Sequence, residues 1–154
     1  MLDLLRHGHA LPADEGGDDL SRLSPRGRSD LEHLAGRLMT MGWRPDRVFT
    51  SPLARARESA LVTLRGAAPD RTPEPMEALR PESHPSEVVA ALEAEGATTG
   101  HLLLVGHQPQ MGLLAALLVG GSPPGFATGT LQRIEFKGTL VPGAGVLGLR
   151  LSPA

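Results

Sequence analysis

Short apolar runs alternate along this chain with longer segments whose apolar residues recur at helical spacing. The runs at 2–5, 47–50 and 101–105 are typical of buried strands. After the first of them, an apolar stripe from Leu31 to Met39 has the spacing of an amphipathic helix. Alternation of strands and helices favours a largely parallel sheet with helices on both faces. The sequence therefore predicts the α/β class, as a three-layer sandwich with a mostly parallel sheet.

Capping and turn residues set the expected boundaries of the elements. Ser24 followed by proline predicts a helix start and Gly42 its end, while Pro52 predicts a second helix that ends at Gly66. The last two strands flank a turn at VPGAG, which favours an antiparallel pair at the edge of the sheet. The other expected elements are helices at 86–95 and 109–119, those two strands at 131–137 and 146–151, loops at 11–23 and 121–129, and an unassigned segment at 76–79.

Composition restricts the class of protein further. A chain of 154 residues with 40% hydrophobic and 21% charged residues is expected to form one globular domain over residues 1–154. The absence of cysteine excludes disulfides, thiolate chemistry and cysteine-bound zinc. A net charge of −2 gives no reason to expect a nucleic-acid or membrane partner. With no apolar run near the roughly 20 residues of a membrane span and no signal-peptide pattern, we expect a cytoplasmic protein.

Charged and polar residues follow three of the predicted strands at the point where each ends. The first strand is followed by Arg6-His7-Gly8, the second by Ser51-Pro52 with Arg55 in the next helical turn, and the third by Gly106-His107. In open α/β sheets, ligands bind beyond the carboxyl ends of the strands. We therefore expect these three clusters to converge in one crevice, although about fifty residues separate each from the next.

Two histidines and two arginines in one crevice suit a phosphoryl group. The planar forks of Arg6 and Arg55 can each hold equatorial oxygens, and the helix N-termini behind Pro52 and Gln108 add backbone donors. A neutral imidazole has a lone pair that can act as nucleophile, and flanking arginines favour the neutral form. Glycine at position 8 lets the backbone approach the phosphate closely.

Each residue taken alone has an ordinary structural interpretation. A histidine at a strand end is often only hydrogen-bonded, and Arg55 alone is typical of a solvated helix residue. Their joint placement at strand exits is what favours a site. His9 and His33 are expected at the surface, and a zinc site of His7, His9 and His107 with a carboxylate is disfavoured by the arginines. We expect no metal and no cofactor.

The motifs Arg6-His7-Gly8, SPLARARES at 51–59 and VGHQP at 105–109 resemble those of the histidine phosphatase superfamily, also called phosphoglycerate mutase-like. Their order and spacing match over essentially the whole chain. The resemblance implies His7 as the nucleophile that becomes phosphorylated, with Arg6, Arg55 and His107 binding the phosphoryl group, a similar fold and no metal. The short length and the stretch LSPRGRSD at 23–30 are most similar to SixA-type phosphohistidine phosphatases.

One departure from the family pattern bears on the substrate. Many relatives carry an acidic residue as Leu-x-Glu, whereas this chain has Leu79-Arg80-Pro81 and places Glu82 one residue later. Either Glu82 serves as general acid, or no strong acid is present. A general acid is typically worth about 10²–10⁴-fold in rate and matters most for a poor leaving group. Its displacement favours phosphohistidine, whose P–N bond releases an imidazole, over an alkyl phosphate.

Three functions follow from these residues. The first is a phosphatase that removes phosphate from histidine on a phosphorelay or phosphotransfer protein through a covalent intermediate. The second is a broad-specificity phosphomonoesterase for small phosphorylated substrates. The third is a phosphate-recognition module without catalysis. A purely structural protein would leave the charged residues at the strand exits unexplained.

Overall fold

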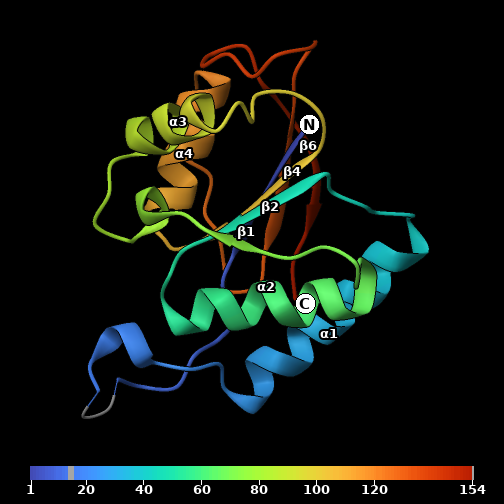
Figure 1. Cartoon of the computed structure of the whole chain (residues 1–154), viewed down its shortest axis with the longest axis vertical. Helices are drawn as coiled ribbons and strands as arrows, with labels where there is room; N and C mark the ends of the chain where they lie inside the picture. Colours follow the sequence, from blue (N-terminus) through green and yellow to red (C-terminus); the bar gives the residue numbers. More distant parts are fainter. Residues whose placement is uncertain (14–15, 154) are drawn as a thin grey trace.

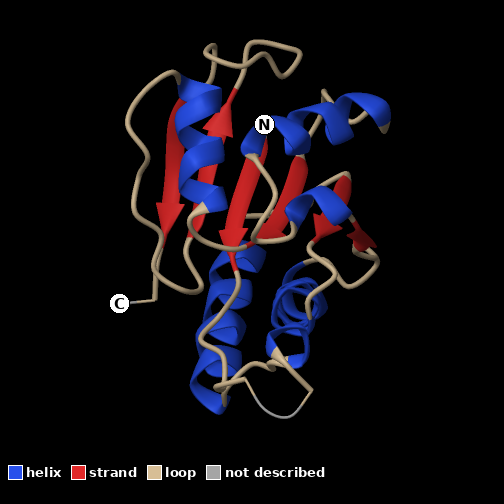
Figure 2. Cartoon of the chain, turned by 90° about the vertical axis from the view of Figure 1, so that its left-hand side faces the viewer, coloured by secondary structure: helices blue, strands red, loops and turns tan. Residues whose placement is uncertain are grey.

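The sheet of the computed structural model, which describes residues 1–13 and 16–153, contains six strands in the order β3-β2-β4-β1-β5-β6. Residues 14–15 of the loop predicted at 11–23 lie outside the described residues. The strands β2, β3, β4 and β1 pair in parallel, and β5 and β6 continue the sheet antiparallel to an edge at β6 (Figure 2). Their bounds are β1 Leu2–Arg6, β2 Arg47–Thr50, β3 Glu74–Pro75, β4 Leu102–Gly106, β5 Leu131–Glu135 and β6 Val146–Leu151. The mostly parallel sheet and the antiparallel final pair are thus confirmed.

Helices cover both faces of this sheet. In Figure 1, α1 and α2 lie on one side of the strands and α3 and α4 on the other, which confirms the three-layer arrangement. The unassigned segment after β3 forms a short 3₁₀ turn, η2. The bounds are α1 Pro25–Thr40, α2 Ala54–Ala67, α3 Pro85–Ala94 and α4 Gln110–Val119, with the 3₁₀ turns η1 Asp18–Leu20 and η2 Glu77–Leu79.

Two apolar cores result from the alternation of side chains along the central strands. On β4, Leu102 and Leu104 pack with α3 and α4, whereas Leu103 and Val105 pack with α1 and α2. All five residues of β4 are buried. A parallel strand covered on both faces is apolar throughout. This explains why the segment at 101–105 has the most continuous strand pattern in the sequence.

The N-terminus of α1 forms as the sequence predicts. The Ser24 hydroxyl accepts a hydrogen bond from the Gly27 amide at 3.0 Å, and Pro25 occupies the first helical position. After the helix, Gly42 adopts a positive φ of 69°.

The second helix differs from the prediction at both ends. It begins at Ala54 instead of Pro52, and it continues through Gly66, which does not end it. A Cβ added to Gly66 would lie 2.7 Å from the Cβ of Ala35, so this glycine allows α1 and α2 to pack closely. Met39, expected in the apolar stripe of the first helix, is exposed, and so is Leu61 of α2.

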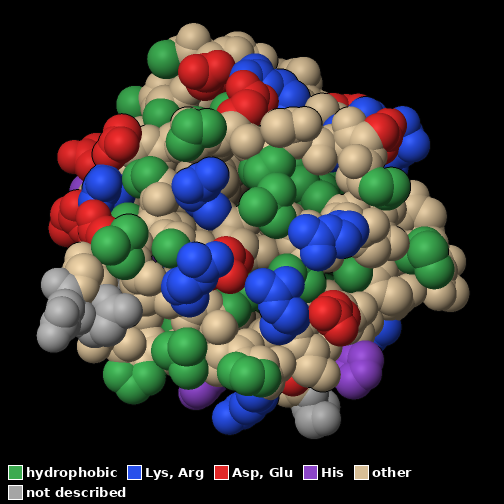
Figure 3. Space-filling view, turned by 60° about the horizontal axis from the view of Figure 1, so that its bottom comes forward, with side chains coloured by type: hydrophobic (Ala, Val, Ile, Leu, Met, Phe, Trp, Pro, Cys, Tyr) green, Lys and Arg blue, Asp and Glu red, His purple; other side chains and the backbone are tan. Residues whose placement is uncertain are grey.

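The outward side of α1 and α2 is polar and basic. Figure 3 turns this end of the molecule toward the viewer and shows several basic side chains there, which on these two helices are arginines. None of the helices in the described part of the chain is long and apolar enough to cross a membrane. The exposed arginines of the two helices are Arg26, Arg28, Arg37, Arg57 and Arg65.

A buried carboxylate fixes the start of β1. The Asp3 side chain is completely buried and accepts hydrogen bonds from Trp43 Nε1 at 2.7 Å, from Arg133 Nε at 2.8 Å and from His101 Nε2 at 2.7 Å. Burial alone would raise the pKa of Asp3, but these hydrogen bonds and the charge of Arg133 lower it to about 2. The carboxylate thus ties β1 to β5, to the start of β4 and to the connection that precedes β2.

We expect Asp3→Asn to lower the free energy of unfolding at pH 7 by about 3 kcal/mol, because the partly buried Arg133 loses its counter-charge. The folded pKa of Asp3 lies below the unfolded one, so its stabilisation is present above about pH 4 and is lost as the pH falls toward 2. Urea unfolding at pH 7 and pH 3 measures both effects, with Asp30→Asn, a partly exposed carboxylate of α1, as control. Equal losses in the two variants would contradict this expectation.

Candidate active site

The exit of β1 is held by backbone hydrogen bonds on both sides. The His7 amide donates to the Gly106 carbonyl at 2.9 Å, and the Arg6 amide donates to the Thr130 carbonyl at 3.0 Å. The Gly129 amide donates to the carbonyls of Arg6 and His7 at 3.1 and 3.0 Å. The backbone under these two side chains is therefore fixed between β4 and the segment that precedes β5.

The His7 imidazole is buried, and the contact of one ring nitrogen indicates where its hydrogen lies. Its Nδ1 lies 2.7 Å from the Gly8 carbonyl oxygen. A carbonyl only accepts hydrogen bonds, so we place the hydrogen on Nδ1, which leaves the lone pair of the neutral ring on Nε2. The ring centroid lies 5.1 Å from that of His107. Two of the three predicted exits therefore meet.

The third exit contacts the second histidine directly. Ser51 follows β2, and its Oγ lies 2.8 Å from His107 Nε2. Among the described residues, the other ring nitrogen of His107, Nδ1, is buried without a hydrogen-bond partner. Burial, and secondarily repulsion from neighbouring cations, lowers the pKa of the His107 imidazole to about 3, so the ring is neutral at pH 7.

A proton on His107 is disfavoured by the charges of Arg55 and Arg6 and, when His7 is itself protonated, by the charge of His7. The structure therefore brings together the four residues that the sequence places at separate strand exits. We call Arg6, His7, Arg55 and His107 the histidine–arginine cluster. A group of buried donors and imidazoles at the carboxyl edge of a parallel sheet is suited to bind an anion.

The two arginines reach the cluster from different elements. Arg6 ends β1, and its Nη1 donates to the Phe126 carbonyl at 2.7 Å, whereas its Nε is buried with no partner in the described chain. Burial lowers the pKa of Arg6. Arg55 is the second residue of α2 and is 8% exposed, so it is not the solvated helix residue it would be in isolation.

Close packing around position 8 explains why a glycine occupies it. A Cβ there would lie 2.9 Å from Leu31 Cδ1 and 3.1 Å from Leu23 Cδ2. The Gly8 amide donates to Ser59 Oγ at 3.0 Å, and the Ser59 hydroxyl donates to the Arg55 carbonyl at 2.6 Å. Ser59 thus joins the exit of β1 to the first turn of α2. The approach of Gly8 to a phosphate stays a prediction.

The proposed general acid is exposed, unlike the buried His7, Arg55 and His107. Glu82 is exposed, in the segment between η2 and α3. The side chain of Gln110 holds this segment, because its Nε2 lies within 3.2 Å of the carbonyl oxygens of Ala78, Arg80 and Ser83. The segment that carries Glu82 is therefore anchored to the start of α4, and a catalytic role for Glu82 stays a prediction.

Arg80 connects the same segment to the chain that follows β1. Its guanidinium lies 2.7 Å from a carboxylate oxygen of Glu77 and 3.1 Å from one of Asp19 in η1. Both pairs are exposed at the surface. Exposed pairs of this kind contribute up to about 1 kcal/mol.

The other histidines lie outside the cluster. His9 is exposed, with its Nδ1 2.7 Å from Ser24 Oγ, and His33 is exposed on α1. Within residues 1–13 and 16–153, no group of three or more His, Asp or Glu side chains is arranged to hold a metal ion.

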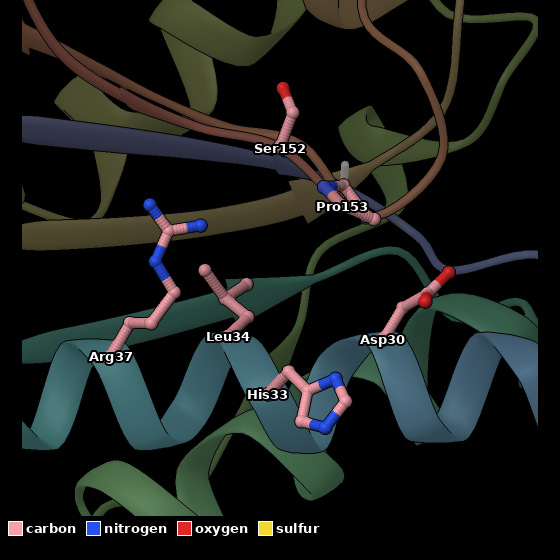
Figure 4. A pocket seen from close by; sticks show the side chains of 7 residues that line it. Asp30, His33, Leu34, Arg37, Ser152 and Pro153 are labelled. Atoms are coloured by element: carbon pink, nitrogen blue, oxygen red, sulfur yellow. The ribbon is translucent and has the colours of Figure 1, made fainter.

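A separate pocket of about 250 Å³ lies between α1 and the end of β6 (Figure 4). None of the histidine–arginine cluster lines it. It shares Gly129 with the backbone contacts of the β1 exit. Its walls are formed by Asp30, His33, Leu34, Arg37, Gly129, Ser152 and Pro153.

Sequence reasoning missed the contacts of three polar residues: Ser51 and Ser59 support the cluster, and Gln110 holds the segment that carries Glu82. Ser51 was predicted at the exit of the second strand but without a contact of its own, and the other two were given no role. Ser59 and Gln110 lie in segments that were assigned to helices, so a polar residue at a buried helical position was the available signal.

The sequence profile of the histidine phosphatase superfamily (branch 1) matches residues 2–81, more than half of the chain. The chain belongs to the histidine phosphatase superfamily. The matched range contains Arg6, His7 and Arg55, and His107 follows it. A curated protein from Picosynechococcus sp., described as uncharacterized, is 32% identical over 99% of this chain and 86% of its own length.

Solved structures extend this similarity over the whole chain. A protein histidine phosphatase SixA in complex with tungstate has a TM-score of 0.85 and 26% identity, over 99% of this chain and 96% of that one. A protein named as a phosphohistidine phosphatase SixA from Agrobacterium tumefaciens has a TM-score of 0.82 and 24% identity, over 99% and 97% of the two chains. The SixA-like resemblance and the fold are confirmed.

We expect His107→Gln to make stability less sensitive to acid. The folded pKa of His107 is about 3, below that of an unfolded histidine near about 6.5, so the unfolded chain binds the extra proton between these values. Native stability therefore falls as the pH drops from about 6.5 to 4, and the variant lacks this contribution. Urea midpoints at pH 7, 5.5 and 4 test it, with His33→Gln as control. An identical pH slope in wild type and His107→Gln would refute the assignment.

Proposed function

We propose that this protein is a phosphatase that hydrolyses phosphohistidine on a phosphorelay or phosphotransfer protein through a phosphorylated His7. One observation carries the proposal. His7 Nδ1 lies 2.7 Å from the Gly8 carbonyl oxygen and donates to it, which leaves the lone pair of the neutral ring on Nε2, inside a cluster that contains two arginines.

The reaction has two displacements at phosphorus. In the first, the lone pair of His7 Nε2 forms a bond to phosphorus while the P–N bond to the substrate imidazole breaks. The electron pair of that bond stays on the substrate nitrogen, which takes a proton from solvent. In the second, water attacks the phosphorus of phospho-His7, inorganic phosphate leaves, and Nε2 recovers its lone pair as the proton of water passes to solvent.

The other members of the cluster hold the group in transfer. Charge spreads over the three equatorial phosphoryl oxygens, and the guanidinium groups of Arg6 and Arg55 are suited to bind them. The buried Nε of Arg6, without a partner in the described chain, supplies one such donor. The neutral His107 ring adds a further N–H donor. It does so without placing another positive charge beside the nucleophile.

Two observations favour a phosphohistidine substrate. The relative at 26% identity is named a protein histidine phosphatase. In addition, the candidate for a general acid, Glu82, is exposed and lies one residue later than in the family pattern. An imidazole leaving group depends less on a general acid than an alkoxide does.

We expect His7→Ala to abolish hydrolysis of a phosphohistidine protein, with a loss of at least about 10³-fold, because no other group provides the nucleophile. Wild type incubated with labelled substrate and quenched in base should retain label on His7. The control is His33→Ala, which removes an exposed histidine of α1. Hydrolysis of para-nitrophenyl phosphate alone would indicate a small-molecule phosphatase, and folded protein inactive on both substrates would indicate a recognition module.

We expect Glu82→Gln to change phosphohistidine hydrolysis by less than about threefold, while any hydrolysis of an alkyl phosphate falls by about tenfold or more. The difference reflects the leaving group, since an alkoxide depends more on a proton donor than an imidazole does. Initial rates on both substrates measure it, with Glu93→Gln on the exposed side of α3 as control. Wild-type rates that are equal on the two substrates would contradict the preference for a P–N bond.

A further inference from the structure

Ser51 is buried beside the cluster and has no role in the steps above. Its amide donates to the Val105 carbonyl at 2.9 Å, which extends the parallel pairing of β2 with β4 by one residue. The side chain is completely buried, and its Oγ lies 2.8 Å from His107 Nε2. The sheet therefore fixes this hydroxyl against one edge of the imidazole.

The direction of this hydrogen bond follows from the other contact of Ser51. The Leu53 amide donates to Ser51 Oγ at 3.2 Å, so the oxygen already accepts one hydrogen. If His107 Nε2 also donated to Oγ, the hydroxyl hydrogen would be buried without an acceptor in the described surroundings, which costs about 1–3 kcal/mol. If Ser51 donates to Nε2 instead, the hydroxyl and Nε2 both have partners, and the hydrogen of the neutral ring must lie on Nδ1, the nitrogen without a partner in the described chain.

We infer that Ser51 is a positioning residue that fixes His107 as the neutral tautomer with its hydrogen on Nδ1, so that this ring donates a hydrogen bond to the phosphoryl group. The inference rests on the proposed function, which places the phosphoryl group at the cluster. It also accounts for the one nitrogen of His107 that has no partner in the described chain.

The two tautomers differ in what they present to an anion. With the hydrogen on Nδ1, the unpartnered nitrogen is a donor. With the hydrogen on Nε2, the same nitrogen is a lone pair that repels phosphoryl oxygens. A carboxylate in place of Ser51 could only accept a hydrogen bond, so it would hold the hydrogen on Nε2, and its charge would favour the protonated ring. A neutral hydroxyl orients the ring and leaves it uncharged.

The first experiment reads the tautomer directly and does not depend on activity. Protonated and bare imidazole nitrogens differ widely in ¹⁵N chemical shift, so long-range ¹H–¹⁵N spectra of labelled protein at pH 7 assign the hydrogen of His107. We expect Nδ1–H in wild type, and a loss of that preference in Ser51→Ala. Ser51→Thr keeps a hydroxyl and should retain it. The control is Thr63→Val, which removes another completely buried hydroxyl that donates to the Ser59 carbonyl.

The second experiment measures anion binding with tungstate as the probe. We expect Ser51→Ala to weaken tungstate binding about tenfold, as suits the loss of one hydrogen bond to a charged ligand, and to lower kcat for phosphohistidine more than it raises KM. Ser51→Thr should restore both, and Thr63→Val should change neither.

The outcomes separate this inference from the proposed function. An Nε2–H tautomer in wild type, or an unchanged tautomer in Ser51→Ala, overturns the role of Ser51 even if the protein hydrolyses phosphohistidine. If wild type is inactive but the tautomer and tungstate affinity respond to Ser51→Ala, the role of Ser51 holds and the proposed hydrolysis fails. The wild-type spectrum decides the tautomer even if a variant does not fold.

Discussion

The candidate site depends on the parallel register of three strands. Val105 of β4 lies opposite Leu5 of β1 on one side and Thr50 of β2 on the other. The next residues of these strands therefore emerge at the same level, and side chains more than fifty positions apart meet without any local motif. A shift of one residue in either pairing would turn the exit residues to the opposite face of the sheet. The backbone ladder is thus the first requirement for the cluster.

The short strand β1 is held in place at both of its ends. At its start, Asp3 binds residues from three other parts of the chain, and at its exit the backbone of His7 is held by β4 and by Gly129. Between these ends the strand is buried against both cores. An element fixed at both ends and on both faces has little freedom to move, so side chains at its exit keep their relative positions.

Much of this arrangement was predictable from sequence, and the remainder has a common cause. Hydrophobic periodicity predicted the layers, and the motifs predicted the cluster. The contacts of Asp3 with His101, of Ser51 with His107 and of Gly66 with Ala35 were not predictable, because each pair is distant in sequence and leaves no periodic pattern. Gly66 shows this most clearly. A glycine near an expected helix end is typical of a C-terminal cap, and only the close approach of α1 shows that this glycine is needed for helix packing.

The contact between Arg6 Nη1 and the Phe126 carbonyl has a thermodynamic consequence. A free arginine side chain loses about 2 kcal/mol of conformational entropy when a ligand orders it. Here the guanidinium is already anchored by its own protein, so that loss belongs to folding and not to ligand binding. The site is preorganised, and an incoming anion meets donors whose orientation it does not have to impose.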